Sequence, residues 1–269
     1  MAHHFDGRGF RIHYVEQGEG QPVVFAHGFL MDHTMFAPQF EDTPDTHRCV
    51  AWDMRGHGLS ECPPGPWALQ DIVDDWIAFV EHVGDGPAHL VGMSTGGMIS
   101  LRLALQRPEL VRSLVLIDTH AGGEEEDRIG LYRSYQQAVR DLEGELLPDD
   151  LAAASLPLLF GPRYLREEMD ALKVHVARGK DMDHTAIVEG LEALITRDSV
   201  ADRLGEIGVP TLVIHGAEDA SIPVARAEAI AAGIPGAELH VIADAGHTTP
   251  LEAPDEVNRL LEGFLRRVS

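Results

Sequence analysis

The stretch Gly92-Met93-Ser94-Thr95-Gly96 determines how the rest of this sequence is interpreted. It lies between an apolar run of strand length at 88–93 and a segment at 95–106 that favours a helix ending before Pro108. The pattern G-x-S-x-G in that position is typical of a sharp strand-to-helix turn that raises the serine hydroxyl above the edge of a sheet. Side chains at the two glycines would collide across so tight a bend. By itself, the stretch also fits a glycine-rich joint without chemistry.

The segments on either side of this turn alternate between strand length and helix length. Short apolar runs predict strands, and amphipathic segments such as 69–83 predict helices with one apolar side. This rhythm is typical of an α/β fold with a mostly parallel central sheet flanked by helices. The expected strands are 10–15 as an edge strand, 23–26, 48–52, 88–93, 111–118, 209–214 and 239–242, and the other expected helices are 95–106, 224–232 and 254–267.

The alternation of predicted strands and helices stops in the middle of the chain. From 121 to 201 the sequence predicts only helical stretches, with breaks at Pro148, Pro157 and Gly161-Pro162. We therefore expect an inserted helical cap at 121–201 and a core built from 1–120 and 202–269. The cap and the loops beneath it supply apolar candidates for a small-molecule pocket, namely Leu30, Met31, Tyr132, Tyr135, Leu159 and Phe160.

The charge balance excludes several classes of partner. The chain of 269 residues has 44 Asp and Glu against 21 Lys and Arg, a formal net charge of -23. Such a charge repels phosphate backbones and anionic lipid head groups, so neither nucleic acid nor a membrane is an expected partner. The densest acidic run, 123–127, is interpreted as a solvated loop.

The terminus and the cysteines favour a cytoplasmic protein. Residues 1–6 have neither a charged leader nor an apolar segment, and no stretch of the sequence is long enough to span a bilayer. Cys49 and Cys62 form neither a metal-ligand pattern nor a disulfide framework. His3 and His4 are expected to be exposed near a frayed terminus.

A serine hydroxyl needs help before it can act as a nucleophile. It requires a base within hydrogen-bond reach and an acid that orients the base, and after a strand-turn-helix serine these follow in the order acid, then histidine. Asp219 lies in a loop after the expected strand 209–214, and His247 follows the last strand, with Gly246 allowing a turn. We therefore predict Ser94, Asp219 and His247 as nucleophile, acid and base.

Each of these assignments has an alternative. Asp219 could cap a helix that begins near Pro223, and His247 could be an ordinary loop histidine. Three other carboxylates compete for the role of the acid. They are Glu218, Asp118, which also follows a strand, and Asp244, which lies close to the base in the sequence.

Attack on a carbonyl creates negative charge on oxygen, which must be met by fixed donors. The backbone amide of Thr95, at a helix N-terminus, is one candidate, and the amide of Phe29, in the loop after strand 23–26, is the second. Gly28 supplies backbone freedom there. His27 is expected to have a structural role.

Taken together, these motifs resemble the α/β-hydrolase superfamily. They are His27-Gly28-Phe29, Asp53-x-Arg55-Gly56-His57-Gly58-x-Ser60, Gly92-x-Ser94-x-Gly96, Gly216-x-x-Asp219 and Gly246-His247, and they cover the chain except for the cap. Within the superfamily, the chain is similar to the capped branch of small esterases, 3-oxoadipate enol-lactonases and cofactor-free haloperoxidases or perhydrolases. The resemblance implies the triad Ser94, Asp219 and His247 and the amides of Phe29 and Thr95. Thr95 stands where many relatives have methionine or glutamine.

We therefore expect a serine hydrolase that cleaves a small carboxylic ester through an acyl-serine, without metal or organic cofactor. A 3-oxoadipate enol-lactonase-like activity, a perhydrolase or haloperoxidase activity and a non-catalytic receptor are the alternatives. An anionic lactone would be repelled by the acidic chain unless an arginine met it, and Arg133, Arg163 and Arg166 are the candidates in the cap. The sequence leaves the oligomeric state open.

Overall fold

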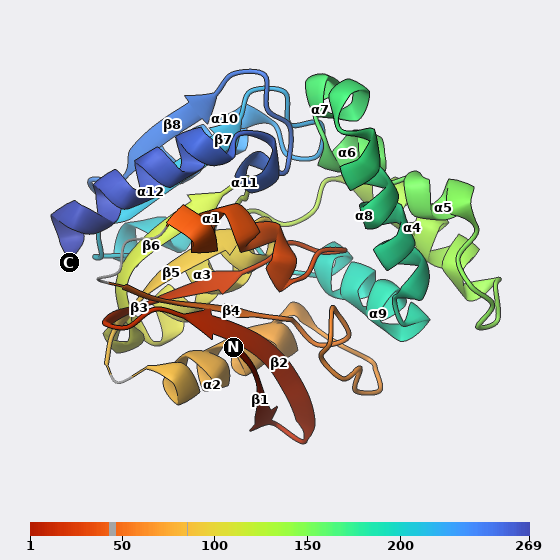
Figure 1. Cartoon of the computed structure of the whole chain (residues 1–269), viewed down its shortest axis with the longest axis horizontal. Coiled ribbons are helices and arrows are strands. Elements are labelled where there is room, and N and C mark those ends of the chain that lie inside the picture. The colour runs from red at the N-terminus through yellow and green to blue at the C-terminus, as the bar shows by residue number, and fades with distance from the viewer. Residues whose placement is uncertain (43–46, 85) are drawn as a thin grey trace.

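Residues 1–42, 47–84 and 86–269 are described by a computed structural model, in which one eight-stranded sheet organises the chain (Figure 1). Its strands are β1 (Ala2–Gly7), β2 (Phe10–Gln17), β3 (Gln21–Ala26), β4 (His47–Trp52), β5 (Ala88–Met93), β6 (Val111–Ile117), β7 (Thr211–Gly216) and β8 (Glu238–Ile242). They lie in the order β1-β2-β4-β3-β5-β6-β7-β8. The pairs from β4 to β8 are parallel, so the carboxyl ends of β3 to β8 meet at one edge. The predicted α/β class with a mostly parallel sheet is confirmed.

The N-terminal edge of the sheet differs from the prediction. Residues 10–15 do belong to a strand, but β1 pairs with it in antiparallel register, so β2 is an interior strand. His3 and His4 therefore lie in regular structure and not at a frayed end. His3 stacks on Tyr14 and lies 3.2 Å from a carboxylate oxygen of Glu16. These cross-strand contacts depend on pairing, which a short polar segment does not reveal by its own periodicity.

Helices cover both faces of the sheet. One face packs against α2 (Leu69–Val83), α3 (Thr95–Gln106) and α10 (Val224–Gly233), and the other against α1 (Ala37–Asp42) and α12 (Pro254–Val268). Successive strand residues go to opposite cores: Val24 and Leu90 to the first, and Phe25 and Val91 to the second. Because both faces are buried, these strands are apolar throughout, which explains the continuous runs in the sequence.

A helical insertion separates β6 from β7. It comprises α4 (Glu126–Arg140), α5 (Asp149–Ala153), α6 (Leu156–Leu159), α7 (Pro162–Glu167), α8 (Met169–Asp181) and α9 (His184–Ile195). These helices lie beside the sheet in Figure 1, with α6 and α7 on the side of α11 (Thr249–Glu252). A small core of its own, which includes Val139, Leu147 and Leu191, holds the insertion together.

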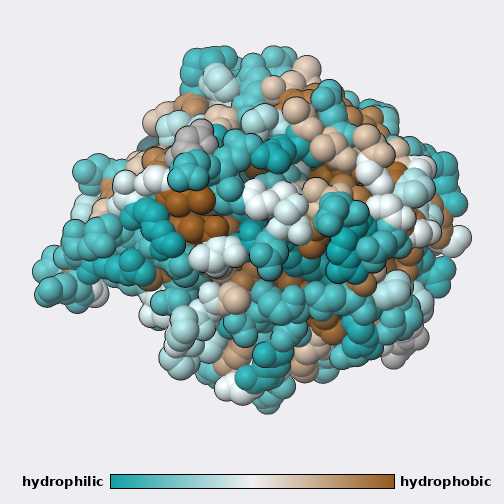
Figure 2. Space-filling model, turned by 180° about the vertical axis from the view of Figure 1, so that it is seen from behind, coloured by the Kyte–Doolittle hydropathy of each residue, from teal (hydrophilic) through white to brown (hydrophobic). Residues whose placement is uncertain are grey.

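The surface is mostly hydrophilic on one face. On the face shown in Figure 2, hydrophilic residues dominate and hydrophobic residues form separate patches. Among the described residues, no helix combines the length and the apolar character needed to cross a membrane.

Candidate active site

Ser94 lies on a strained turn between β5 and α3. Its backbone has φ 50° and ψ -115°, a region that non-glycine residues rarely adopt. The turn is locked because Ser94 N donates to Ile117 O at 2.9 Å and Ser94 O accepts from Thr119 Oγ1 at 2.7 Å. A Cβ at Gly96 would lie 2.0 Å from Ala26 O, so only glycine fits. The turn therefore holds the hydroxyl at the carboxyl edge of the sheet.

The structure brings the three predicted side chains together. Ser94 Oγ lies 3.0 Å from His247 Nε2, and His247 Nδ1 lies 2.7 Å from Asp219 Oδ2. The other oxygen of Asp219 accepts the amides of Ser221 and Ile222, both at 2.8 Å, which fixes the orientation of the carboxylate. The side chain of Asp219 is fully buried, so this contact is shielded from water. The hydroxyl can donate to Nε2 while Nδ1–H donates to the acid.

The competing acids lie elsewhere. Asp118 is buried, but its oxygens accept the Gly216 amide at 2.9 Å and the amide and hydroxyl of Thr249 at 3.0 and 2.7 Å. Burial, followed by the nearby charge of Asp219, raises the pKa of Asp118 well above its ordinary value. Glu218 is exposed, and the backbone carbonyl of Asp244 lies 3.4 Å from a guanidinium nitrogen in the insertion. Of the four carboxylates, Asp219 is the one in hydrogen-bond contact with His247.

Opposing effects act on the pKa of His247. Burial lowers the pKa of its imidazole, but the charge of Asp219 and the hydrogen bond from Nδ1 to it outweigh this effect, with smaller contributions from Asp118 and Glu252. The net result is a pKa above the ordinary histidine value. A base of this kind takes up the serine proton more readily than a free imidazole does.

The predicted oxyanion donors flank Ser94. Thr95 is the first residue of α3, where backbone N–H groups have no partner within the helix. Gly28 lies so close to the turn that a Cβ there would come within 3.2 Å of Ser94 Cβ, and the following residue, Phe29, lines the same cavity as Ser94. His27 is buried, and its Nε2 accepts the amide of Met54 at 2.9 Å, a structural contact as predicted.

A cavity of about 250 Å³ opens onto Ser94 and His247. Of the predicted pocket residues, Leu30, Tyr132, Tyr135 and Leu159 line it. Met31 and Phe160 are not among its lining residues: both are buried in the second core cluster, where Phe160 stacks on Tyr164 of α7. The other apolar lining residues come from the loop after β3, α3, the insertion and the loop after β7, and they are Phe29, Met98, Leu131, Ala154, Leu158, Leu191, Leu194, Ile222 and Pro223.

Part of the cavity lining is polar, which the sequence did not predict. Glu124, in the run interpreted as a solvated loop, has a side chain only 9% exposed and lies 2.9 Å from Arg197 Nη1, so that interpretation was wrong for this residue. Arg197 also lies 2.6 Å from Nε2 of the cavity residue His120. Burial, then the charge of Arg197, lowers the pKa of His120 to about 3. The position of His120 just after β6, at the edge where the other site residues lie, was the signal that could have identified it.

Two arginines of the cavity were also missed. Arg226 pairs with Glu125, and Arg128 donates to the carbonyl of Ala220. The arginines that the sequence suggested, Arg133, Arg163 and Arg166, are not among the residues that line the cavity. Arg133 instead pairs with Glu192.

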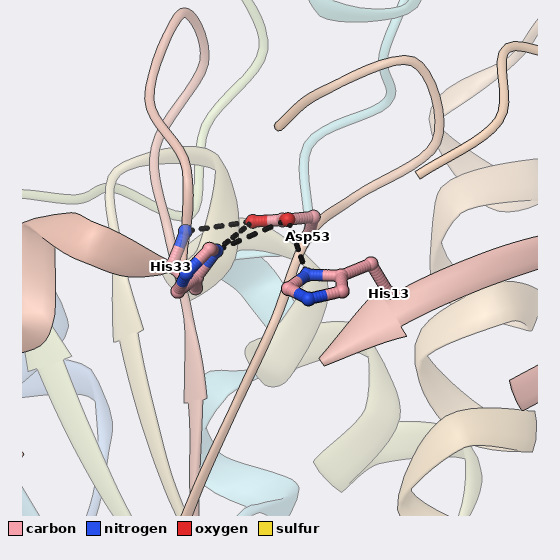
Figure 3. A group of neighbouring side chains, drawn as sticks. All are labelled: His13, His33 and Asp53. Atoms are coloured by element: carbon pink, nitrogen blue, oxygen red, sulfur yellow. Dashed lines mark hydrogen bonds and ion pairs between the residues drawn. The ribbon is translucent and has the colours of Figure 1, made fainter. Parts of the chain in front are cut away.

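A second group of ionisable residues comprises the buried His13 and Asp53 and the partly buried His33 (Figure 3), none of which lines the cavity. Asp53 accepts His13 Nδ1 at 2.8 Å and His33 Nδ1 at 2.9 Å, together with the amides of His33 and Leu59 at 2.7 and 3.0 Å. These residue types could hold a cation. However, the hydrogen bonds already use both carboxylate oxygens and both Nδ1 atoms, so the group is explained as the anchor of the 53–60 loop.

Comparison with known proteins places the chain in a family. Residues 21–254 match the model of the alpha/beta hydrolase fold family, and the chain therefore belongs to it. The structure is similar to that of a thermophilic esterase from Thermogutta terrifontis, with a TM-score of 0.90 and 28% identity over 100% of this chain and 99% of that one. The enol-lactonase of Burkholderia xenovorans LB400 aligns with a TM-score of 0.89 and 25% identity, over 98% of this chain and all of the other.

A curated relative has a further activity. The 2-hydroxymuconate semialdehyde hydrolase of Pseudomonas putida is 31% identical over 96% of this chain and 91% of its own length. These similarities confirm the resemblance that the sequence motifs suggested, and the family includes both ester and lactone hydrolases.

Proposed function

We propose that this protein is a serine hydrolase that cleaves small carboxylic esters, with Ser94 as nucleophile, His247 as base and Asp219 as orienting acid. The observation that carries the proposal is the continuous hydrogen-bonded chain from Ser94 Oγ to His247 Nε2, at 3.0 Å, and from His247 Nδ1 to Asp219 Oδ2, at 2.7 Å. A hydroxyl and an imidazole in this arrangement form the nucleophile and base of acyl transfer.

The proposed reaction has two half-reactions. Ser94 Oγ attacks the ester carbonyl carbon while its proton passes to His247 Nε2, and the resulting oxyanion is met by the amides of Phe29 and Thr95. The intermediate collapses as the carbonyl–alkoxy bond breaks, and His247 gives its proton to the departing alcohol. Water then gives a proton to His247 and attacks the acyl-serine carbonyl carbon. The bond from that carbon to Ser94 Oγ breaks, the acid is released, and His247 returns its proton to Ser94 Oγ.

The cavity supports a small and largely neutral substrate. Its volume, about 250 Å³, is below the range of about 300–1,000 Å³ that is usual for drug-sized ligands. Most of its lining is apolar, and its arginines already have partners in Glu125 and the carbonyl of Ala220. In this proposal, residues 121–201 form the cap that shields the acyl-serine from bulk water, while 1–120 and 202–269 form the core.

An anionic lactone is the second candidate, and a specific observation favours testing it. Arg128 and Arg226 both line the cavity, and the similar structure of an enol-lactonase shows that the fold accommodates such an activity in that protein. A carboxylate would have to compete with Glu125 for Arg226, so we place neutral esters first.

A hydrolysis screen tests the proposal. Acetyl to octanoyl p-nitrophenyl esters, simple lactones and an enol-lactone are compared with wild-type protein and with Ser94→Ala. We expect short esters to be the preferred substrates and Ser94→Ala to be inactive while folded. Fluorophosphonate labelling of Ser94 provides a second readout. Undiminished hydrolysis by Ser94→Ala would refute the assignment, and an unlabelled, inactive wild-type protein would favour a receptor.

A further inference from the structure

Glu252, at the end of α11, is a buried carboxylate whose oxygens are fully used. Oε2 accepts the amides of Gly246 and Gly161, both at 2.9 Å. Oε1 accepts the amide and the hydroxyl of Thr248, both at 3.0 Å. A buried carboxylate that accepts three amides, and shares the single hydroxyl proton of Thr248 with Leu159 O, is well compensated, whereas a neutral replacement leaves some of those donors without a partner.

Two of these donors flank the base. Gly246 and Thr248 are the residues immediately before and after His247, so one carboxylate holds the backbone on both sides of the imidazole. Asp219 holds the ring itself, at Nδ1. The position of Nε2 relative to Ser94 therefore depends on Asp219 for ring orientation and on Glu252 for the location of the backbone.

The same carboxylate reaches the insertion. Gly161 joins α6 to α7, and its amide shares Oε2 with that of Gly246. The hydroxyl of Thr248 lies 3.0 Å from the carbonyl of Leu159, and Arg163 Nη2 donates to the carbonyl of Glu252 at 2.6 Å. Leu159 lines the cavity, so this junction fixes part of its wall.

The backbones of Gly161 and Gly246 pack tightly against each other. A Cβ on Gly246 would lie 2.2 Å from Gly161 N, and a Cβ on Gly161 would lie 2.8 Å from Gly246 N. The two backbones are thus in direct contact, and neither glycine accepts a side chain without movement. Hydrogen bonds and direct backbone contact therefore join the segment 159–163 to the histidine loop 244–252.

We propose that Glu252 is a positioning residue that fixes His247 and the Leu159 wall of the cavity as one unit. The inference rests on the ester hydrolysis proposed above. It predicts that a change at Glu252 alters both the base and the preference for acyl size, although Glu252 lies outside the hydrogen-bonded chain that links Ser94, His247 and Asp219. Electrostatics add to the effect, because the charge of Glu252 contributes to the raised pKa of His247, together with the larger contribution of Asp219 and that of Asp118.

Glu252→Gln is the central test, with Glu256→Gln as the matched control. Glu256 is exposed on the next helix and lies 3.4 Å from Arg259. Glutamine has one acceptor oxygen where glutamate has two, so the amides of Gly161, Gly246 and Thr248 cannot all be satisfied. We expect kcat per labelled active site to fall about 10- to 100-fold, because a small displacement of the base is costly. Glu256→Gln should match wild type.

Two further readouts separate positioning from a general structural role. The acid limb of the kcat/KM profile should move to lower pH in Glu252→Gln, because a negative charge near His247 is lost. His120, His215, Asp118 and Asp219 also interact with His247 and are unchanged in this variant. The ratio of kcat/KM for butanoyl and acetyl esters should change as well, because Leu159 is no longer held in its position in the cavity wall. Wild-type values of per-site kcat, acid limb and ester ratio would overturn the proposal even if the variant melts at a lower temperature.

Thr248→Val provides the test if Glu252→Gln does not fold. It removes only the hydroxyl contacts to Glu252 and to Leu159 O and keeps the carboxylate. We expect an altered ester ratio and an unmoved acid limb, and an unchanged ratio would overturn the link to the wall. Hydrolysis by Ser94→Ala would instead refute the proposed ester hydrolysis through Ser94. A failure of that function can therefore be distinguished from a failure of the proposed role of Glu252.

Discussion

Two buried carboxylate–histidine groups in this molecule have nearly the same bond and different surroundings. His247 Nδ1 lies 2.7 Å from Asp219, and His13 Nδ1 lies 2.8 Å from Asp53. The far nitrogen of His247 meets the Ser94 hydroxyl beside a cavity. The far nitrogen of His13 is buried and has no hydrogen-bond partner in the described part of the chain.

The difference shows that an aspartate–histidine pair does not by itself make a reactive site. Asp53 is shared by two imidazoles and two backbone amides, and these contacts anchor loops (Figure 3). Asp219 also has two imidazoles nearby, since His215 Nε2 lies 3.4 Å from Oδ2, but its hydrogen bond to His247 Nδ1 leaves Nε2 of that ring facing the Ser94 hydroxyl. Chemistry requires a reactive partner and accessible space at the second nitrogen, which only the Asp219 group has.

The largest difference in activity between the two groups is expected when the imidazole of each, His247 or His13, is removed. His247→Ala should lower kcat/KM for a short ester by about 10⁵- to 10⁶-fold, because the base is lost. His13→Ala should leave kcat per folded molecule within about tenfold, since His13 is remote from the chemistry. Steady-state kinetics normalised to folded protein measures both. Equal losses in the two variants would contradict the distinction between the groups.

The next largest effect on kcat is expected from neutralising Asp219. Asp219→Asn should reduce kcat by about 10³- to 10⁴-fold, because the amide no longer fixes the productive tautomer of His247. Asp118→Asn is the matched control, a buried carboxylate that binds Gly216 and Thr249. Ester hydrolysis by the two purified variants provides the measurement. If Asp118→Asn proved the more damaging change, Asp118 would be the orienting acid.

Activity should also depend on pH in a direction fixed by His247. Protonated His247 cannot accept the serine proton, so kcat/KM should fall about tenfold per pH unit below the pKa of the free enzyme. Because that pKa is raised, the fall should begin at a higher pH than it would for an ordinary histidine. A pH profile with a neutral ester checks this, and a limb displaced below the ordinary histidine range would count against the geometry.

The smallest effect on turnover is expected at Asp53. Asp53→Asn should leave kcat within about threefold, and should lower the free energy of unfolding by about 2–4 kcal/mol because several buried donors lose their charged acceptor. Burial raises the pKa of Asp53, but the hydrogen bonds from His13 and His33 outweigh this and lower it. The stabilisation is therefore complete above the ordinary aspartate pKa and is lost as the pH falls through the lowered one. Urea unfolding at neutral and acid pH measures it, and equal midpoints for wild type and variant at neutral pH would contradict it.

Much of the fold could be predicted from local patterns. The helix at 69–83 has the bounds of α2, and the strand at 88–93 those of β5, because amphipathic periodicity and apolar runs mark them directly. β1 was missed because its residues alternate between exposed and half-buried, and their partner strand supplies the stabilising contacts. The short helix α11 was missed because four residues have too little periodicity.

The candidate active site also has features that the sequence predicted and features that it did not. The sequence predicted that Ser94, Asp219 and His247 would lie together, since all three follow strands whose carboxyl ends share one edge. It could not separate Leu159 from Phe160, which are adjacent in the chain and belong to the same core cluster, although Leu159 also lines the cavity and Phe160 does not. It also gave no sign of Glu252, whose partners Gly161 and Thr248 come from different parts of the chain.

By itself, the sequence determined the order of the elements, the turn at Ser94 and the types of side chain available for chemistry. These features depend on residues within a few positions of one another, so steric and periodic rules suffice. The tertiary structure was needed to distinguish Asp219 from the competing carboxylates as the partner of His247, and to show which histidines anchor loops and which side chains line the cavity. Those outcomes depend on distances between segments that are remote in the chain, and packing of the sheet, helices and insertion sets these distances.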